Sequence, residues 1–387
     1  MSVRAADEAL VFLGGDVMTG RGIDQALAHP SSPELYESFV RDARDYLRLA
    51  EGANGAVPAP VTPAYVWGDA LAELDRAAPV ARIVNLETAV TTSNRPWPGK
   101  GIHYRMHPAN VDCLTAARLD CCVLANNHVM DWGRDGLADT LATLERAGMR
   151  TAGAGPDADA ARAPAVVPLP GGGRVLVFAA ATESSGVPED WSAAPHRPGI
   201  ALLPEPGAAA AAELASRVAA HRRDGDLVIV SIHWGGNWGC RIPHAHREFA
   251  HRLIDLRGAD LVHGHSSHHP LPAEVHRGRL ILYGCGDLIN DHEGIGDTTE
   301  CARHRMSLVR DARAPQARCA ACRIVPLQLR RRLGPADPRA EHSARRVADA
   351  GGSCLRHAPS RRAGRRLVAR PWRPWGPGPA EPARGKH

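Results

Sequence analysis

LVFLGGDVMTGRG, residues 10–22, is a short hydrophobic run that ends on two glycines and an aspartate. A run of this kind is typical of a buried strand, and the glycines let the backbone turn sharply beside the carboxylate. In open α/β sheets, ligands gather at the carboxyl ends of strands, where loops are free to carry chemistry. We therefore expect Asp16 to belong to a functional site whose other members lie elsewhere in the chain.

The composition is that of a globular protein. The 387 residues are 44% apolar, which is enough for one large domain or two ordinary ones. The N-terminal MSVRAADEALVF has acidic residues before a short apolar run, so we expect no secretory signal. No apolar run approaches the ~18 residues of a membrane helix. The sequence therefore predicts a cytoplasmic protein without a membrane segment.

The cysteines do not form a disulfide framework, because their number is nine and their spacing is irregular. Cys319 and Cys322 form one CxxC pair, but a structural zinc site needs a second ligand pair at a suitable spacing. We expect these two cysteines to be small side chains in or near a hairpin.

Basic charge is confined to the C-terminal part of the chain. Residues 329–387 contain 15 Lys and Arg against 4 Asp and Glu, or +11, which leaves −6 for residues 1–328 because the whole chain carries +5. The main part therefore gives no reason to expect nucleic acid as a partner. We predict one domain over 1–328, a basic, weakly structured extension over 329–370, and a disordered Pro/Arg-rich tail over 371–387. A reading-frame slip near residue 330 is an alternative hypothesis for this change in composition, which resequencing of the gene would test.

Strand-like and helix-like patterns alternate along the main part, which predicts an α/β fold. The expected strands are LVFLGG, ARIVNLE, CCVLANN, VLVFAAAT, DLVIVSIHWG, ADLVHGH and RLILYGCGD. The expected helices span 34–50, 67–77, 108–118, 134–147, 207–223 and 244–257. Gly148 is a candidate C-terminal cap, and the turn at Arg277-Gly278 indicates a hairpin.

Nearly every expected strand ends in a residue that can bind metal or transfer a proton. These residues are Asp16, Glu87, Asn126, Asn127, His128, His233, His263, His265, His268, His269 and Asp287. A helix cap, a turn residue or a packed core imidazole would explain most of them singly. Several imidazoles together in HGHSSHH are harder to explain by packing, and all the single explanations would have to hold at once.

Carboxylate, amide and imidazole donors together make a mixed oxygen and nitrogen site. Such a site suits Mn, Fe or Zn better than Ca²⁺ or a thiolate site. A shared carboxylate such as Glu87 would bridge two ions ~3.5–4 Å apart, so that a water is activated and the leaving oxygen stabilised. His128, next to Asn127, would then protonate a leaving group or stabilise an oxyanion.

The order GD, NLE, NNH, HWG and GHxxH resembles the motif blocks of the calcineurin-like metallophosphoesterase superfamily. GDVMTGR, NLETAVT, LANNHVMDWG, SIHWGGNWG and LILYGCGDLIND are more closely similar to the CapA family, whose proteins are associated with poly-γ-glutamate capsule synthesis. The resemblance spans residues 10–328. It implies a metallophosphoesterase-like four-layer α/β/β/α sandwich that holds one or two divalent metal ions.

Residue by residue, the resemblance implies metal ligands at Asp16, Glu87, Asn127, His233, His265 and His268, with His128 as the catalytic residue. Arg21 and Lys100, the latter in the WPGKG loop, are expected to face an anionic small-molecule or polymer substrate, although solvation alone would explain basic residues. Met18 stands where classical phosphoesterases have a histidine, so one metal site lacks a ligand. HGHSSHH also replaces a shorter His-Pro-His, which leaves the choice of ligating histidines open.

Three functions are compatible with this reading. The leading hypothesis is a metal-dependent hydrolase of CapA type that cleaves an amide or a phosphoester. Polymer-synthesis proteins are its expected protein partners. The alternatives are a generic metallophosphoesterase and a non-catalytic component of a polymer-synthesis complex. The number of imidazoles at strand ends favours the catalytic hypotheses.

Overall fold

The computed structural model describes residues 8–170, 172–203, 205–292, 305–312 and 319–326. Among these residues, no helix is both long enough and apolar enough to cross a membrane. The predicted extension and tail at 329–370 and 371–387 lie outside the described residues, so their boundaries stay predictions.

The first sheet carries the opening motif on a central strand. Its strand order is β18-β17-β1-β2-β5-β6, and β16 also pairs with β1. Strands β2, β5, β6 and β16 run parallel to β1, whereas β17 pairs with β1 in antiparallel orientation and β18 pairs with β17 in antiparallel orientation. The bounds are β1 Glu8–Val17, β2 Ala81–Leu86, β5 Cys121–Val123, β6 Arg150–Ala152, β16 Asp287–Ile289, β17 Arg305–Ala312 and β18 Cys319–Pro326. The β17–β18 pair contains Cys319 and Cys322, in agreement with the expected hairpin.

The second sheet has the order β11-β9-β12-β13-β15-β14, with β8 paired to β9. Its central strands are parallel and its β8 and β14 are antiparallel. The bounds are β8 Ala165–Pro168, β9 Arg174–Thr182, β11 Leu202–Leu203, β12 Leu227–His233, β13 Leu261–His265, β14 Ala273–His276 and β15 Arg279–Leu282. Two short pairs, β3 Ala89–Val90 with β4 Arg105–Met106 and β7 Ala154–Gly155 with β10 Gly199–Ile200, complete the strands of the described residues.

The two sheets face each other across a continuous apolar core. In β9, Val175 and Val177 belong to the core shared with the first sheet. Leu176 and Phe178 belong to a second core beneath the helices α7 (Ala208–His221) and α8 (His244–Asp255). This alternation follows from the two-residue period of a strand. Because both faces of the sheet are covered, its strands are nearly continuous apolar runs rather than alternating ones.

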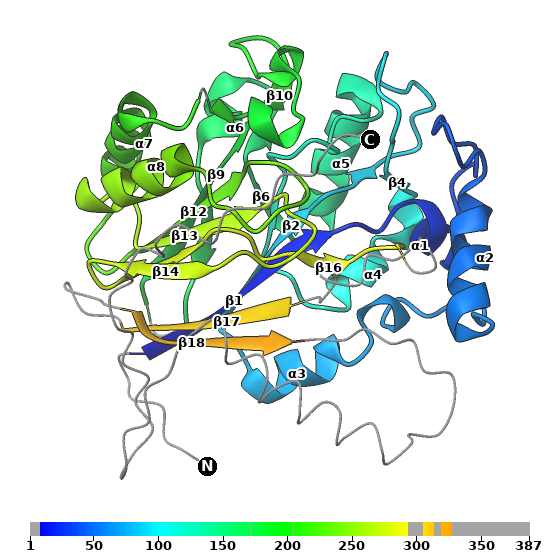
Figure 1. Cartoon of the computed structure of the whole chain (residues 1–387), viewed down its shortest axis with the longest axis horizontal. Helices are drawn as coiled ribbons and strands as arrows, with labels where there is room; N and C mark the ends of the chain where they lie inside the picture. Colours follow the sequence, from blue (N-terminus) through cyan, green and yellow to red (C-terminus); the bar gives the residue numbers. More distant parts are fainter. Residues whose placement is uncertain (1–7, 171, 204, 293–304, 313–318, 327–387) are drawn as a thin grey trace, which may run out of the picture.

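Helices cover the outer face of each sheet, which confirms the expected four-layer α/β/β/α arrangement. In Figure 1, α7 and α8 lie together beside β12 and β13, and α1 and α2 lie at the opposite end of the molecule. The helices are α1 Arg21–Ala26, α2 Ala43–Asn54, α3 Ala70–Ala77, α4 Asp112–Thr115, α5 Gly133–Arg146, α6 Ala158–Arg162, α7 Ala208–His221 and α8 His244–Asp255, with short 3-10 helices at Tyr65–Trp67, Pro108–Asn110, Glu183–Ser185 and Glu189–Trp191.

The local predictions were correct for the strands and less accurate for two helices. Each of the seven expected strand runs contains a strand, and the hairpin turns at Arg277-Gly278, both with positive φ as a type I′ turn requires. The helix expected over 34–50 was wrong in its first half, because α2 begins only after Asp42, whose side chain caps it by accepting from the backbone N–H of Arg44. The helix expected over 108–118 is instead a 3-10 turn followed by the short α4.

The end of β1 is shaped by a glycine that no other residue can replace. A Cβ atom at Gly15 would lie 1.7 Å from the backbone oxygen of Gly286. The pairing register of β1 with β2 shifts between Gly14 and Asp16, so a bulge aims the carboxylate at the strand end. Gly15 of the opening motif therefore lets the backbone of β1 lie close to that of Gly286, immediately before Asp16.

Candidate metal centre

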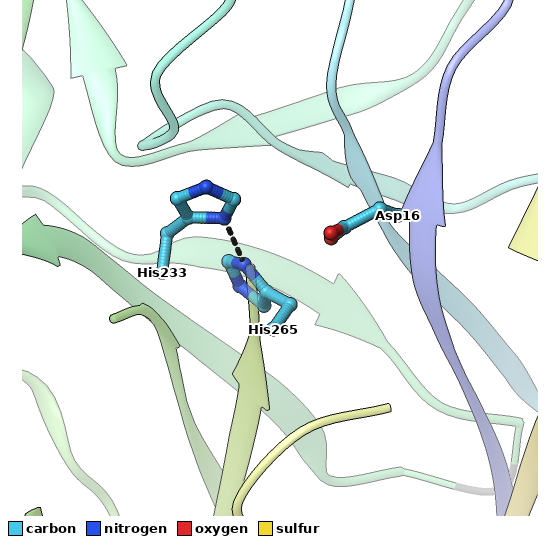
Figure 2. A group of neighbouring side chains, drawn as sticks. All are labelled: Asp16, His233 and His265. Atoms are coloured by element: carbon cyan, nitrogen blue, oxygen red, sulfur yellow. Dashed lines mark hydrogen bonds between the residues drawn. The ribbon is translucent and has the colours of Figure 1, made fainter. Parts of the chain in front are cut away.

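Side chains from the strand ends of both sheets converge at one place. Two groups of donors each have their ligand atoms within 4.8 Å of one another, namely Asp16 with His233 and His265, and Asp16 with Glu87 and His268. Figure 2 shows the first group, in which β1 of one sheet supplies the carboxylate and the other sheet supplies both imidazoles. All but His268 among these residues are fully or almost fully buried.

Asp16 belongs to both groups and is held from two sides. Its Oδ1 accepts from Asn85 Nδ2 at 2.8 Å, and its Oδ2 accepts from the backbone N–H of Ser266 at 3.3 Å. The amide of Asn85 is in turn held by Asn126, whose Nδ2 donates to Asn85 Oδ1 at 3.1 Å. Asn126 therefore holds the amide of Asn85 in place, while its neighbour Asn127 faces His233.

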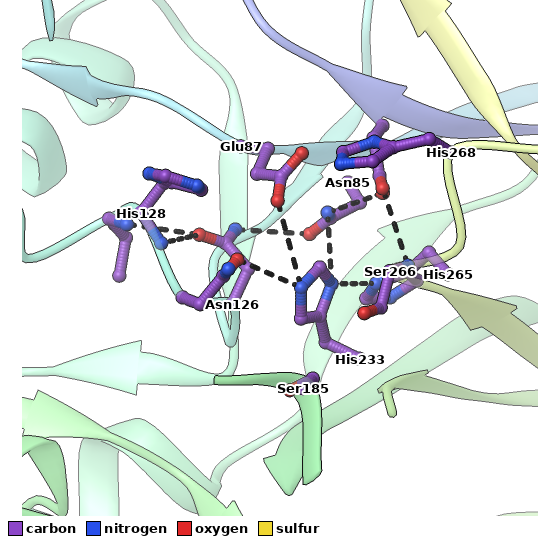
Figure 3. Close-up of polar contacts among 12 residues, drawn as sticks. Asn85, Glu87, Asn126, His128, Ser185, His233, His265, Ser266 and His268 are labelled. Atoms are coloured by element: carbon purple, nitrogen blue, oxygen red, sulfur yellow. Dashed lines mark hydrogen bonds and ion pairs between the residues drawn. The ribbon is translucent and has the colours of Figure 1, made fainter. Parts of the chain in front are cut away.

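His233 is the residue around which the remaining donors are arranged. Its Nε2 lies 3.0 Å from Asn127 Oδ1 and 3.7 Å from Glu87 Oε1, and its Nδ1 lies 2.8 Å from His265 Nδ1. Figure 3 shows Glu87 and Asn85 pointing towards this imidazole. The carboxylate, amide and imidazole donors predicted from the sequence are thus brought together.

His268 lies on the other side of Asp16 and forms an ion pair with Asp287. His268 Nδ1 is 2.9 Å from Asp287 Oδ1, and Asn290 Nδ2 donates to Asp287 Oδ2 at 2.6 Å. Burial opposes a charge on His268, but the carboxylate of Asp287 outweighs it and raises the pKa of the imidazole. His269 and His263 are also buried, but neither belongs to either donor group.

The electrostatics of this cluster fit a bound cation. Burial, reinforced by the nearby charge of Asp287, raises the pKa of Asp16 to about 7. Burial and the charge of Asp16 also raise the pKa of Glu87 well above its usual range. Burial together with neighbouring imidazoles lowers the pKa of both His233 and His265 well below the ordinary value. Buried carboxylates that repel one another, beside neutral imidazoles, are the donor set that a divalent ion would stabilise.

His128 lies buried next to the cluster, in contact with Asp131, Lys100 and Tyr104. Its Nδ1 is 2.7 Å from Asp131 Oδ2 and 3.1 Å from Lys100 Nζ, and the Lys100 ammonium lies 2.6 Å from Asp131 Oδ1. The ring of Tyr104 stacks on the imidazole at a centroid distance of 3.8 Å. Burial, with the nearby charge of Lys100, lowers the pKa of His128 well below the usual value, so a neutral imidazole is favoured.

Lys100 contacts His128, Arg21 contacts the Tyr104 ring that stacks on His128, and both cations are already paired. The Lys100 side chain is largely buried against Asp131. Arg21 is 4% exposed and pairs with Asp291 and Glu37, while its guanidinium lies 4.8 Å from the centroid of the Tyr104 ring. These contacts give Arg21 a structural role, and contact of either cation with a substrate stays a prediction.

Sequence reasoning missed the residues that hold the ligands and His128 in place. Asp131 was visible in ANNHVMDWG, three residues after His128, but a turn can place such a residue anywhere. Asp287 was noted at a strand end without a role, and Asn85 was hidden inside an apolar strand. Their roles depend on side-chain directions that spacing does not reveal.

Two facing sheets flanked by helices, with Asp, Asn and His side chains where their strand ends meet, define an α/β protein with a candidate metal centre between its sheets. The family model for the bacterial capsule synthesis protein PGA_cap matches residues 10–292. The chain belongs to this family, which includes the CapA proteins.

Two curated relatives agree with the family assignment. A probable polyglutamine synthesis accessory protein of Mycobacterium tuberculosis strain H37Rv is 51% identical over 291 residues, which are 75% of this chain and 76% of the relative. The PGA biosynthesis protein CapA of Bacillus subtilis is 28% identical over 208 residues, covering 54% of this chain and 52% of that protein. Among solved structures, a putative 5′-nucleotidase from Staphylococcus aureus in complex with alpha-ketoglutarate is similar with a TM-score of 0.47 and 12% identity, over 88% of this chain and 58% of the other.

Proposed function

We propose that this chain is a metal-dependent hydrolase that acts in the synthesis of a poly-γ-glutamate-type anionic polymer. The observation that carries the proposal is the convergence of Asp16, Glu87, Asn127, His233, His265 and His268, from separate strand ends, beside His128. The polymer assignment is supported by the family description and by the names of the mycobacterial and Bacillus relatives. The word accessory in the mycobacterial name favours action beside other polymer-synthesis proteins.

Asp16, Glu87, Asn127 and the three histidines would hold one or two divalent ions of Mn, Fe or Zn. A divalent ion held there would supply Lewis-acid chemistry, lowering the pKa of a water and offsetting negative charge on a substrate. The carboxylates and imidazoles of the chain orient that chemistry, and their burial excludes bulk water.

His128 is the group that moves a proton in this proposal. Its Nδ1 faces the carboxylate of Asp131 at 2.7 Å, so a hydrogen at Nδ1 is held there and Nε2 is the nitrogen left to act on a substrate. Nε2 carries a lone pair, so it first takes a proton from the attacking water. The imidazolium formed in this way stabilises the developing charge on a substrate oxygen and then passes the proton to the leaving group. Lys100 stands beside the same pair and adds positive charge to a position that an anionic substrate would approach.

The test begins with metal content. Protein freed of metal with a chelator and reloaded with Mn²⁺, Fe²⁺ or Zn²⁺ is expected to retain one or two ions per chain. The loaded protein is then assayed with γ-glutamyl peptides and with an aryl phosphodiester. The His128→Ala variant is expected to keep its metal and to lose about 10²–10⁴-fold in turnover. His221→Ala serves as the matched control, because His221 is exposed at the end of α7.

Each outcome selects among the candidate functions. Turnover of γ-glutamyl peptides supports the proposal, whereas turnover of the phosphodiester alone favours a generic metallophosphoesterase. A metal-loaded chain that turns over neither substrate, and that assembles with polymer-synthesis proteins equally well after His128→Ala, would favour a non-catalytic component. Failure to retain any divalent ion would remove the basis of the proposal.

A further inference from the structure

A row of hydrogen bonds runs behind the candidate metal centre and ends on His265, one of its candidate ligands. On β12 and β13, alternate residues face the space between the sheets, and Ser231 lies in register with His263 while His233 lies in register with His265. The residues preceding them on the same faces, Ile229 and Leu261, belong to the apolar core. The core therefore changes from apolar to polar within one strand period, and every polar group there needs a partner.

These partners form a continuous chain of contacts. His263 Nε2 lies 2.9 Å from the backbone oxygen of Gly14, and His263 Nδ1 lies 3.0 Å from Ser231 Oγ. Ser231 Oγ also lies 2.9 Å from His265 Nε2. All three side chains are fully buried, so bulk water does not compete for these contacts.

The positions of the hydrogens follow from what each group can donate or accept. A backbone oxygen only accepts, so His263 carries its hydrogen on Nε2. Its nitrogens face a carbonyl and a hydroxyl, neither of which offsets the charge of an imidazolium, so burial favours the neutral ring with a lone pair on Nδ1. Ser231 then donates its hydroxyl hydrogen to His263 Nδ1, and its oxygen is left to accept from His265 Nε2.

We propose that Ser231 and His263 are positioning residues that hold His265 in the tautomer with its hydrogen on Nε2, so that Nδ1 is presented as a metal ligand. The lone pair on Nδ1 points towards His233, whose Nδ1 lies 2.8 Å away (Figure 2). A histidine ligand is commonly fixed in this way by the partner of its other ring nitrogen. The anchor of the row is Gly14 in β1, two residues before Asp16, so the same contacts tie the two ligand-bearing sheets together.

The proposal rests on the metal centre of the proposed function, but its first test needs no metal. Metal-free protein labelled with ¹⁵N in its histidine rings is examined by long-range ¹H–¹⁵N correlation, and the signals of His265 are assigned from the spectrum of His265→Gln. The expected result is a hydrogen on Nε2 of His265. A hydrogen on Nδ1 of His265 in the metal-free protein would overturn the proposal, whatever the protein binds.

The second test measures affinity for Mn²⁺ and Zn²⁺ by competition with a chromophoric chelator. Ser231→Ala removes the acceptor for His265 Nε2 and is expected to weaken binding about 10–100-fold. Ser231→Thr keeps the hydroxyl and is expected to restore most of the affinity. Thr140→Val is the matched control, because it removes another buried hydroxyl, which bonds to Val90 and Gly136 and contacts none of the candidate ligands.

The outcomes separate this inference from the proposed function. Wild-type affinity in Ser231→Ala would overturn the positioning role while leaving the metal centre intact. Equal losses in Ser231→Ala and Thr140→Val would overturn it as well, because the effect would then be one of general stability. Absence of metal binding by the wild type would instead overturn the proposed function, and if Ser231→Ala does not fold, the tautomer of wild-type His265 still decides the inference.

Discussion

Substitution of Arg21 by alanine is expected to destabilise the fold far more than it weakens any substrate contact. The Arg21 guanidinium is buried, pairs with Asp291 and Glu37, and also donates to the hydroxyl of Tyr46. Its loss leaves two buried carboxylates without their cation, which typically costs about 3–5 kcal/mol. Arg21 has a φ of +45°, a backbone conformation that disfavours alanine as much as arginine. The difference in unfolding free energy between wild type and Arg21→Ala therefore comes from the side chain and not from the backbone.

The measurement is urea unfolding followed by far-UV circular dichroism. A loss of about 4 kcal/mol is a large part of the ~5–15 kcal/mol that stabilises a typical domain, and at a slope of ~3 kcal/mol/M it lowers the midpoint by on the order of 1 M. Arg48→Ala is the matched control, since Arg48 forms an exposed ion pair with Asp45 on α2 and such pairs contribute about 1 kcal/mol or less. Equal midpoints for the two variants, with a higher KM only for Arg21→Ala, would refute the structural role and restore Arg21 as a substrate contact.

Two further predictions concern backbone approach and pH. Gly15→Ala is expected to abolish soluble folded protein, because its Cβ would lie 1.7 Å from the backbone oxygen of Gly286. Gly52→Ala has nothing within 4 Å of its Cβ and should raise the stability measured in thermal melts by about 0.5–1 kcal/mol. Comparable yields and melting temperatures for the two variants would contradict this prediction. Burial lowers the pKa of His246 to about 4, against an ordinary value of 6.5, so the unfolded chain takes up the proton first and stability is lost as pH falls from 6.5 towards 4. His246→Phe keeps the stacking on Trp234 and should show a smaller loss across this window in urea titrations, and an unchanged loss would argue against the buried neutral imidazole.

The fold could be predicted from the sequence because its strands are buried on both faces. Runs such as VLVFAAAT and DLVIVSIHWG are too apolar and too short for exposed helices, and the bounds of β9 and β12 lie within two residues of the expected ones. Parallel strands also bring their carboxyl ends to one edge of a sheet, so Asp16 and Glu87 could be predicted to lie close together without knowledge of the strand order. His233 lies on β12 of the second sheet and meets them only because the two sheets face each other. The four-layer arrangement itself was predicted from the resemblance to a family and not from the periodicity of the sequence.

The remainder of the site depended on information that spacing does not contain. Asp131 pairs with His128 because a turn after β5 brings it back, and Asp287 pairs with His268 because β16 lies beside β1. The helix over 34–50 failed for a related reason, since Asp42 bonds to a backbone N–H as a cap and so sets the first residue of α2. In each case the partner of a polar side chain is set by the three-dimensional fold and not by spacing along the sequence.

The strand order also explains which carboxylate is shared. The sequence favoured Glu87 as the bridge between two ions, and bridging by Glu87 stays a prediction. In the structure, however, Asp16 belongs to both donor groups, whereas Glu87 belongs to one. β1 lies between β2, which leads to Glu87, and β16, which begins at Asp287, while the histidines of β12 and β13 face it from the other sheet. A carboxylate at the end of the central strand is within reach of donors on every side, so removal of Asp16 takes an oxygen ligand from both groups at once.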